Sequence, residues 1–224
     1  LVYNTEINKQ RMENRMSSTE IQNFIPWKKI VKYNNKDWTK QQFLLFKFYT
    51  AIPPRRIKDY SLLKYVKNKP IASVKKLDKN FNYLLVNKRS NPIALVINNY
   101  KTKKKFGQYN IDLTQSDNKP YFRYGEIRSS IKDFATKLNT GDFIFNQTNF
   151  TKQINDLFTG TLKNVSVNVL RHSFISHFLD NHSKASDNTV LKFAKAMGHQ
   201  PQTFRSYRKL DAVDEEEDEE DDDE

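Results

Sequence analysis

The chain has 224 residues, a formal net charge of +12, no cysteine and 13% aromatic residues. This length suits one domain with extensions, and the aromatic content argues for a buried core. The lack of cysteine excludes a disulfide scaffold and a thiolate metal site. No apolar run approaches the ~20 residues of a membrane span, and no segment resembles a signal peptide.

The charge is divided between a basic body and an acidic end. Residues 214–224 are eleven consecutive acids. Without them, 15 acidic residues face 38 lysines and arginines, so the rest of the chain has a formal charge of +23. A body this basic suits a polyanion such as DNA or RNA. The alternative is a lysine-rich protein from an AT-rich genome with no such partner. An acidic run cannot bury apolar surface, so we expect residues 211–224 to form a disordered tail.

The N-terminal part of the chain predicts helices. Residues 1–24 are polar and helix-compatible, and the chain begins with Leu1 rather than Met. We therefore expect the remnant of a linker helix that follows a missing upstream domain. Pro26 and Trp27 predict the start of a helix. A second helix is predicted over 41–50, with Thr39 as its N-cap.

A break and a small sheet are predicted next. Pro53-Pro54 ends the second helix and opens a short one that runs to residue 60. Three β-rich segments follow, at residues 83–86, 93–97 and 109–113, and turns are predicted at 89–92 and 103–107. These segments predict a three-stranded antiparallel sheet, with Lys101 at or near a hairpin.

The C-terminal half has three groups of apolar residues at helical spacing. They are Ile127, Ile131, Phe134 and Leu138; Val167, Leu170, Phe174 and Phe178; and Val190, Phe193, Ala194 and Met197. Gly198 predicts the end of the third helix, and Tyr207 falls on a last short one. The predicted fold class is α+β, mostly α, with one small three-stranded antiparallel sheet, and the predicted domain spans residues 25–210.

Five polar residues stand in contexts that suit one kind of chemistry. They are Arg56 in Pro53-Pro54-Arg55-Arg56-Ile57-Lys58-Asp59, Lys101 in Tyr100-Lys101-Thr102, Arg171 in Leu170-Arg171-His172-Ser173-Phe174, His199 after Gly198, and Tyr207 eight residues later. Two arginines, a lysine and a histidine can surround one phosphate, and a tyrosine beside them can attack it. In this order and these contexts, the five residues resemble the catalytic domain of the tyrosine recombinases, the phage-type integrase family.

The resemblance implies a site-specific DNA recombinase or integrase that works through a covalent 3′-phosphotyrosine. Tyr207 would be the nucleophile, and Arg56 and Arg171 would hold the oxygens of the scissile phosphate. Lys101 would protonate the leaving 5′ oxygen, and His199 would hydrogen-bond the phosphate. The chemistry needs no metal, nucleotide or other cofactor. The implied partners are double-stranded DNA and further copies of the chain in a tetramer.

Asn168 departs from the family pattern, which usually has histidine three residues before the second arginine. An asparagine can hydrogen-bond a phosphate oxygen, but it cannot carry a proton near neutral pH. Asn168 is therefore included in the candidate site, with any general-base role weak or moved to another residue.

The two arginine assignments have plainer alternatives. Arg55 competes with Arg56, and the Arg-x-x-acid spacing to Asp59 favours Arg56. A solvated surface arginine is the alternative for Arg56. Arg171 lies in an apolar helix and therefore needs an anionic partner, which is either a phosphate or the carboxylate of a structural ion pair.

The other site residues also have plainer interpretations. Lys101 and any of Lys103, Lys104 and Lys105 can simply contact the DNA backbone. His199 alone would be a residue at a helix end, and Tyr207 alone would be half-buried packing. The remaining histidines, at 172, 177 and 182, are poorly spaced for a metal. No Gly-rich phosphate loop supports nucleotide hydrolysis.

Two other functions stay open at this stage. A type IB topoisomerase-like enzyme shares the chemistry and relaxes DNA as a monomer, and a DNA-binding relative that has lost catalysis is supported by Asn168. The family also implies an N-terminal core-binding domain, which we expect upstream of Leu1. An intracellular location with DNA follows from the resemblance, in the cytoplasm, nucleus or virus factory of a host. The high Asn and Lys content indicates an AT-rich genome, for which a virus or a mobile element is one candidate.

Overall fold

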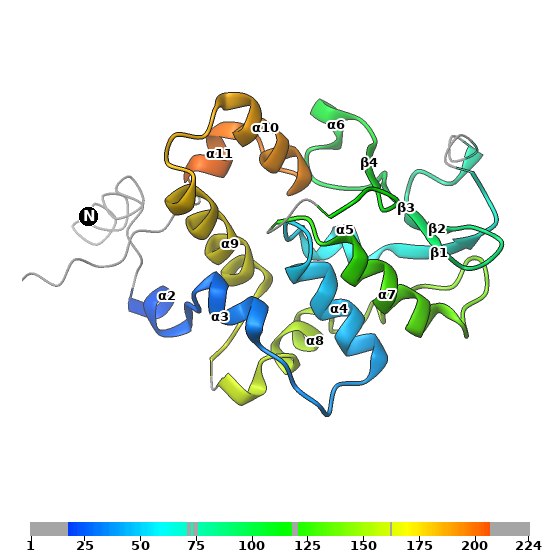
Figure 1. Cartoon of the computed structure of the whole chain (residues 1–224), viewed down its shortest axis with the longest axis horizontal. Coiled ribbons are helices and arrows are strands. Elements are labelled where there is room, and N and C mark those ends of the chain that lie inside the picture. The colour runs from blue at the N-terminus through cyan, green and yellow to red at the C-terminus, as the bar shows by residue number, and fades with distance from the viewer. Residues whose placement is uncertain (1–17, 71–72, 74–75, 118–120, 162, 207–224) are drawn as a thin grey trace, which may run out of the picture.

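A computed structural model describes residues 18–70, 73, 76–117, 121–161 and 163–206. The fold is α+β and mostly helical (Figure 1). The helices are α2 Ser18–Asn23, α3 Trp27–Lys32, α4 Lys40–Thr50, α5 Ile57–Ser61, α6 Lys103–Phe106, α7 Tyr124–Ala135, α8 Phe150–Asp156, α9 Val167–Asn181, α10 Asp187–Ala196 and α11 Pro201–Ser206. The strands are β1 Leu63–Lys67, β2 Asn82–Val86, β3 Pro92–Ile97 and β4 Tyr109–Asp112.

The prediction of a three-stranded antiparallel sheet is wrong. The sheet has four strands in the order β1-β2-β3-β4. β2, β3 and β4 form the predicted antiparallel part, whereas β1 pairs with β2 in parallel, with Tyr65 opposite Leu84. β1 begins two residues after α5 ends and reaches β2 only through residues 68–81. A parallel partner this far along the chain leaves no turn signal beside the strand.

The two predicted helix starts, at Pro26-Trp27 and after Thr39, are confirmed, and two further helices begin at serine caps that were not predicted. Thr39 caps α4 and forms a capping box with Gln42. Ser166 caps α9 and Ser186 caps α10, and each accepts a hydrogen bond from a backbone N–H of its helix. Pro26 stands at the N-cap position of α3, as its fixed φ allows.

Two other local predictions need correction. Residues 103–107 are not a simple turn, because Lys103–Phe106 form the one-turn helix α6, followed by Gly107 at φ +69°. The short helix α8 was not predicted, since it offers few apolar positions. The predicted acidic tail, most of the predicted linker helix and Tyr207 lie outside the described residues.

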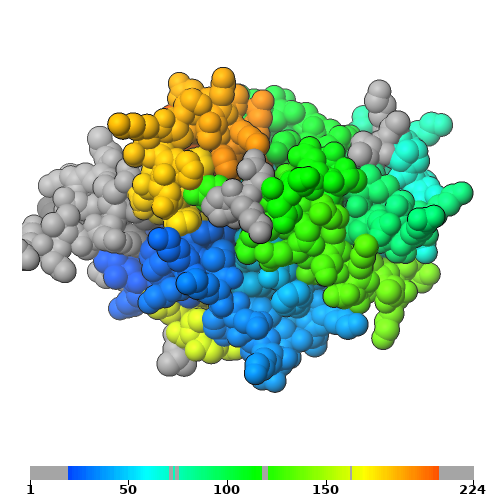
Figure 2. Space-filling view, in the orientation of Figure 1, coloured from blue at the N-terminus to red at the C-terminus, as the bar shows by residue number. Residues whose placement is uncertain are grey.

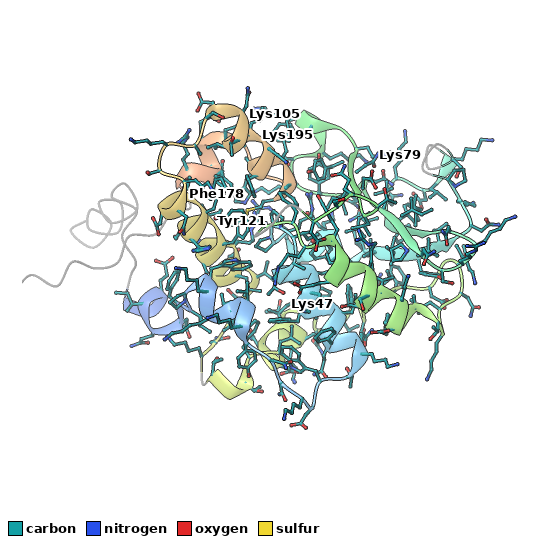
Figure 3. The ribbon with its side chains drawn as sticks, in the orientation of Figure 1. Lys47, Lys79, Lys105, Tyr121, Phe178 and Lys195 are labelled. Carbon is teal, nitrogen blue, oxygen red and sulfur yellow. The ribbon has the colours of Figure 1, made fainter. Side chains whose placement is uncertain are left out.

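The core is rich in aromatic rings and lies between the helices and one face of the sheet. Tyr121 packs on Phe178 with ring centroids 5.4 Å apart (Figure 3), and Phe178 packs on Phe193 at 4.2 Å. A smaller cluster of Val66, Tyr83, Leu85 and Val96 covers the other face of the sheet. Both faces of β2 are therefore buried, which explains its unbroken apolar run.

The arrangement in Figure 1 determines which segments can meet. The sheet lies at the right, α9, α10 and α11 lie at the left and top, and α4, α5 and α7 lie between them. The segment that carries α6 extends from the sheet toward α10. No helix in the described part of the chain combines the length and apolar character needed to cross a bilayer.

Candidate active site

Three segments that are distant in sequence meet at one arginine. Arg171 on α9 is fully buried, with 0% of its surface exposed. Its Nη1 donates to the carbonyl oxygen of Pro54 at 2.9 Å and to that of Met197 at 3.1 Å. The Pro53-Pro54 segment before α5 and the C-terminal end of α10 are thereby both attached to α9.

The end of α10 determines where His199 lies. Gly198 adopts φ +67°, a left-handed conformation that glycine reaches without steric cost. The His199 N–H donates to the Ala194 carbonyl at 2.8 Å, and the Gly198 N–H donates to the Lys195 carbonyl at 3.0 Å. These two bonds form a Schellman motif. The motif turns the chain sharply and buries His199, which is 1% exposed.

The last carbonyl groups of α10 are bound by side chains from the other segments. Arg55 donates to the Ala196 carbonyl, Arg171 to that of Met197, and the Thr102 hydroxyl to that of Gly198. The C-terminal end of a helix carries a partial negative charge, so two guanidiniums are favourable there. The same contacts bring α5, α9 and the β3–β4 connection together around His199.

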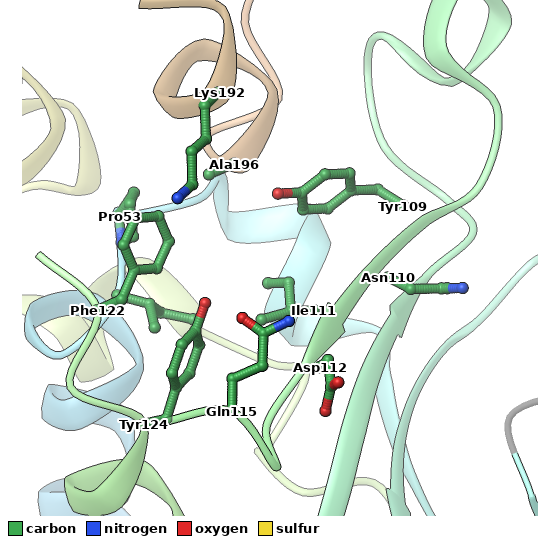
Figure 4. Close-up of a pocket in the computed structure, with 11 residues that line it drawn as sticks. Pro53, Tyr109, Asn110, Ile111, Asp112, Gln115, Phe122, Tyr124, Lys192 and Ala196 are labelled. Atoms are coloured by element: carbon green, nitrogen blue, oxygen red, sulfur yellow. The ribbon is translucent and has the colours of Figure 1, made fainter. Parts of the chain in front are cut away.

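Arg55 is held by an acidic side chain, backbone carbonyls and aromatic rings, while its Nη2 has no hydrogen-bond partner in the described structure. Its Nε donates to Oδ2 of Asp59 at 2.8 Å, and both side chains are buried. The central carbon of its guanidinium lies 5.2 Å from the ring centroids of both Tyr100 and Tyr109. Tyr109 also lines a pocket of about 200 Å³ together with Phe122, Tyr124 and Lys192 (Figure 4). Arg55 is thus a structural centre of the site, which sequence analysis considered only as a rival of Arg56.

Arg56 has a different environment from its neighbour. It is half-buried at the N-cap position of α5, and its Nε is buried with no hydrogen-bond partner among the described residues. Its backbone is extended, with φ −75° and ψ 158°, so Arg55 and Arg56 point in different directions. Both arginines keep a buried nitrogen without a hydrogen-bond partner in the described structure, Nη2 of Arg55 and Nε of Arg56, but only Arg56 is partly exposed.

The site is electropositive. Burial raises the pKa of the Asp59 carboxyl, while the guanidiniums of Arg55, Arg171 and Arg56 lower it. Burial, followed by the charge of Arg171 and then that of Arg56, lowers the pKa of His199 to about 2. His199 is therefore neutral at physiological pH, and three guanidiniums surround one carboxyl group. Such an excess of buried positive charge favours an anionic ligand.

Lys101 lies beside this cluster. It is exposed in the β3–β4 connection, between Tyr100, whose ring lies over Arg55, and Thr102, which binds Gly198. Further along, Lys105 Nζ donates to the Gln200 side chain at 3.0 Å. The connection is therefore attached to the α10–α11 segment at two points that follow Lys101, Thr102 and Lys105, and Figure 2 shows these two parts in contact.

Two predicted residues are not placed in the cluster. Asn168 is exposed in the first turn of α9, one turn before Arg171. Tyr207 lies outside the described residues, although α11 runs to Ser206, the residue before it. The structure thus gathers Arg56, Arg171 and His199 and puts Lys101 alongside them. Arg55 and its partner could have been paired from the sequence, because their i,i+4 spacing suits a helical ion pair.

Comparison with known proteins adds no relative: no family model, curated protein or solved structure matches this chain.

Proposed function

We propose that this protein is a DNA strand transferase of the tyrosine recombinase type. The observation that carries the proposal is the convergence of Arg56, Arg171 and His199, from three distant segments, on one electropositive cluster. If Arg56 were only a surface arginine, or His199 only a residue at a helix end, neither would need to lie near Arg171. A site that binds one phosphate of a DNA backbone requires several such groups together.

The arginines would bind and stabilise the scissile phosphate. Arg171 is fixed through Nη1 by two carbonyl oxygens, so its orientation is set before any ligand arrives. Arg56 has a buried Nε without a partner in the described structure. Guanidiniums that are preorganised around a phosphate stabilise the charge that develops in the transition state.

The neutral His199 and Lys101 complete the proposed chemistry. A neutral imidazole can donate one hydrogen bond to a phosphate oxygen without adding charge. Lys101, on a connection attached beside His199, would give a proton to the leaving 5′ oxygen. Tyr207 would attack the phosphorus and form the 3′-phosphotyrosine. The energy of the broken phosphodiester bond is kept in the phosphotyrosine ester, so ATP is not required. Protein side chains would neutralise the phosphate, so no metal takes part. Asn168 would contribute at most a hydrogen bond.

The partner of such an enzyme is double-stranded DNA, and strand exchange between two duplexes would involve four copies of the chain. A body with a formal charge of +23 outside residues 214–224 supports a DNA partner. The activity would place the protein inside cells, wherever its DNA substrate lies.

The test is a covalent-trapping experiment. The protein is incubated with supercoiled plasmid and genomic DNA in excess EDTA and then denatured with SDS, and protein-linked fragments are captured and sequenced. We expect a 3′ end joined to the protein and a 5′ hydroxyl that accepts label from polynucleotide kinase without prior phosphatase treatment. Fragments with 5′ phosphates, or activity only with added magnesium, would identify a metal-dependent nuclease instead.

Substitutions assign the roles. Tyr207→Phe should bind DNA and form no adduct, whereas Tyr33→Phe, a matched loss of one hydroxyl from a ring that packs on Trp38 and Phe158, should behave as the wild type. Arg171→Lys keeps the charge without the fork and should slow adduct formation by on the order of 10²–10³. Relaxation of plasmid without strand exchange would favour a topoisomerase, and DNA binding without any adduct would favour an inactive relative.

A further inference from the structure

Arg55 makes contacts that exceed those of an ordinary structural ion pair. Its Nε binds Asp59 on α5, its Nη1 binds the carbonyls of Lys195 and Ala196 on α10, and its guanidinium contacts the rings of Tyr100 and Tyr109. One buried side chain thus joins α5, the end of α10, the β3–β4 connection and β4. Each of these elements either carries a residue of the proposed active site or adjoins one.

The packing around Arg55 is tight. A methyl group added at Gly198 would lie 3.2 Å from Arg55 Nη2 and 3.5 Å from Tyr100 Cδ2. Gly198 therefore allows the guanidinium to lie directly under the turn that positions His199. A smaller or displaced side chain at position 55 would leave the Ala196 carbonyl and this turn without their support.

We propose that Arg55 is a positioning residue of the active site. It touches no substrate; its guanidinium fixes the α10 turn and the β3–β4 connection against α5, so that His199, Lys101 and Arg56 keep their relative places. The expected effect of Arg55 on cleavage rests on the proposed strand transfer. Its expected effect on the position of His199 rests only on the contacts above.

The test removes the buried pair as a unit. Arg55→Met/Asp59→Asn deletes both members, so neither is left buried without the other and the net charge is unchanged. The matched control is Lys47→Met/Glu126→Gln, which removes a 2.8 Å ion pair between α4 and α7. Lys47 lies low in Figure 3, away from α10. Arg55→Lys, which keeps the charge and loses the fork, is the second variant if the double variant does not fold.

Single-turnover adduct formation is measured on a duplex that carries a mapped cleavage site, well below the melting temperature of each variant. We expect the Arg55 variants to bind this duplex like the wild type and to cleave it about tenfold more slowly or worse, since small displacements of catalytic groups are costly. The control should cleave at the wild-type rate. An unchanged rate in the Arg55 variants, or an equal loss in the control, would overturn the proposal.

A second measurement is independent of catalysis. The chain has four histidines, and the His199 ring signals in an NMR spectrum can be assigned with His199→Gln. We expect the Arg55 variants to shift the His199 signals while those of His177 and His182 stay in place. If the wild type forms no adduct, the proposed function fails and this spectrum still decides the role of Arg55. Unmoved His199 signals would contradict it.

Discussion

At the scale of single residues, two adjacent arginines differ because of the backbone between them. Arg55 is fully buried and bound by Asp59 and the Ala196 carbonyl, whereas Arg56 is half-buried with a free Nε among the described contacts. The spacing to Asp59 led to the prediction that Arg56 is a phosphate ligand, which stays a prediction. It could not show that the other closes the end of α10, because that contact spans about 140 residues of chain.

His199 provides a prediction about pH. The imidazole of an unfolded chain binds a proton below about pH 6.5, whereas burial and the nearby guanidiniums lower the pKa of folded His199 to about 2. Between these values the unfolded chain binds more protons than the folded one. The stability that His199 contributes is thus complete above pH 6.5 and decreases as the pH falls.

The measurement is the free energy of unfolding of wild type and His199→Gln from about pH 7.5 to about pH 5. We expect the wild type to lose up to about 2 kcal/mol more than the variant by pH 5. Because both proteins contain the other titrating groups, such as Asp59, their contributions to the pH dependence of stability cancel in the difference. Parallel stability curves would show that His199 takes up its proton over the same pH range in the folded protein as in the unfolded chain.

At the scale of elements, the sequence predicts helix starts, which depend on local signals, better than the pairing of strands distant in the chain. Thr39, Ser166 and Ser186 mark helix starts because each side chain accepts a bond from its own helix. β1 carries no such signal: Leu63–Lys67 are short and mixed in polarity, and their partner β2 lies beyond residues 68–81. The contact of the β3–β4 connection with Gly198 is likewise formed between residues distant in the chain, and no local sequence pattern predicts it.

The turn after α10 gives a prediction at this scale. Gly198→Ala forces a side chain into a left-handed conformation and pushes on Arg55 Nη2, which is 3.2 Å from the new methyl group. Gly141→Ala is the control, since Gly141 has φ +104° and open space around it. Both variants should lose about 1–2 kcal/mol of stability from backbone strain.

The two glycine variants should differ in the rate of covalent adduct formation at the proposed active site. Gly198→Ala should slow covalent adduct formation strongly because it displaces the turn that holds His199, whereas Gly141→Ala should leave the rate unchanged below its melting temperature. Adduct formation in a single turnover and thermal unfolding are measured on the same samples. Equal adduct rates in the two variants would show that the turn does not position the site.

At the scale of the whole molecule, opposite charges are carried by separate parts of one chain. Residues 214–224 hold eleven acids, and the remainder has a formal charge of +23. The acidic run begins seven residues after Tyr207 in the sequence. We expect a polyanion joined to the chain at this separation to compete with DNA for the basic body.

Deletion of residues 214–224 should therefore tighten binding to random-sequence duplex DNA. The competition is electrostatic, so the gain should be large at about 0.05 M salt and small at about 0.2 M, where charges are better screened. Affinity is measured for the full chain, for the deletion, and for a variant in which the eleven acids become Asn and Gln. The neutral variant should behave like the deletion, because charge rather than length is responsible. Equal affinities of all three proteins at low salt would exclude competition by the acidic run.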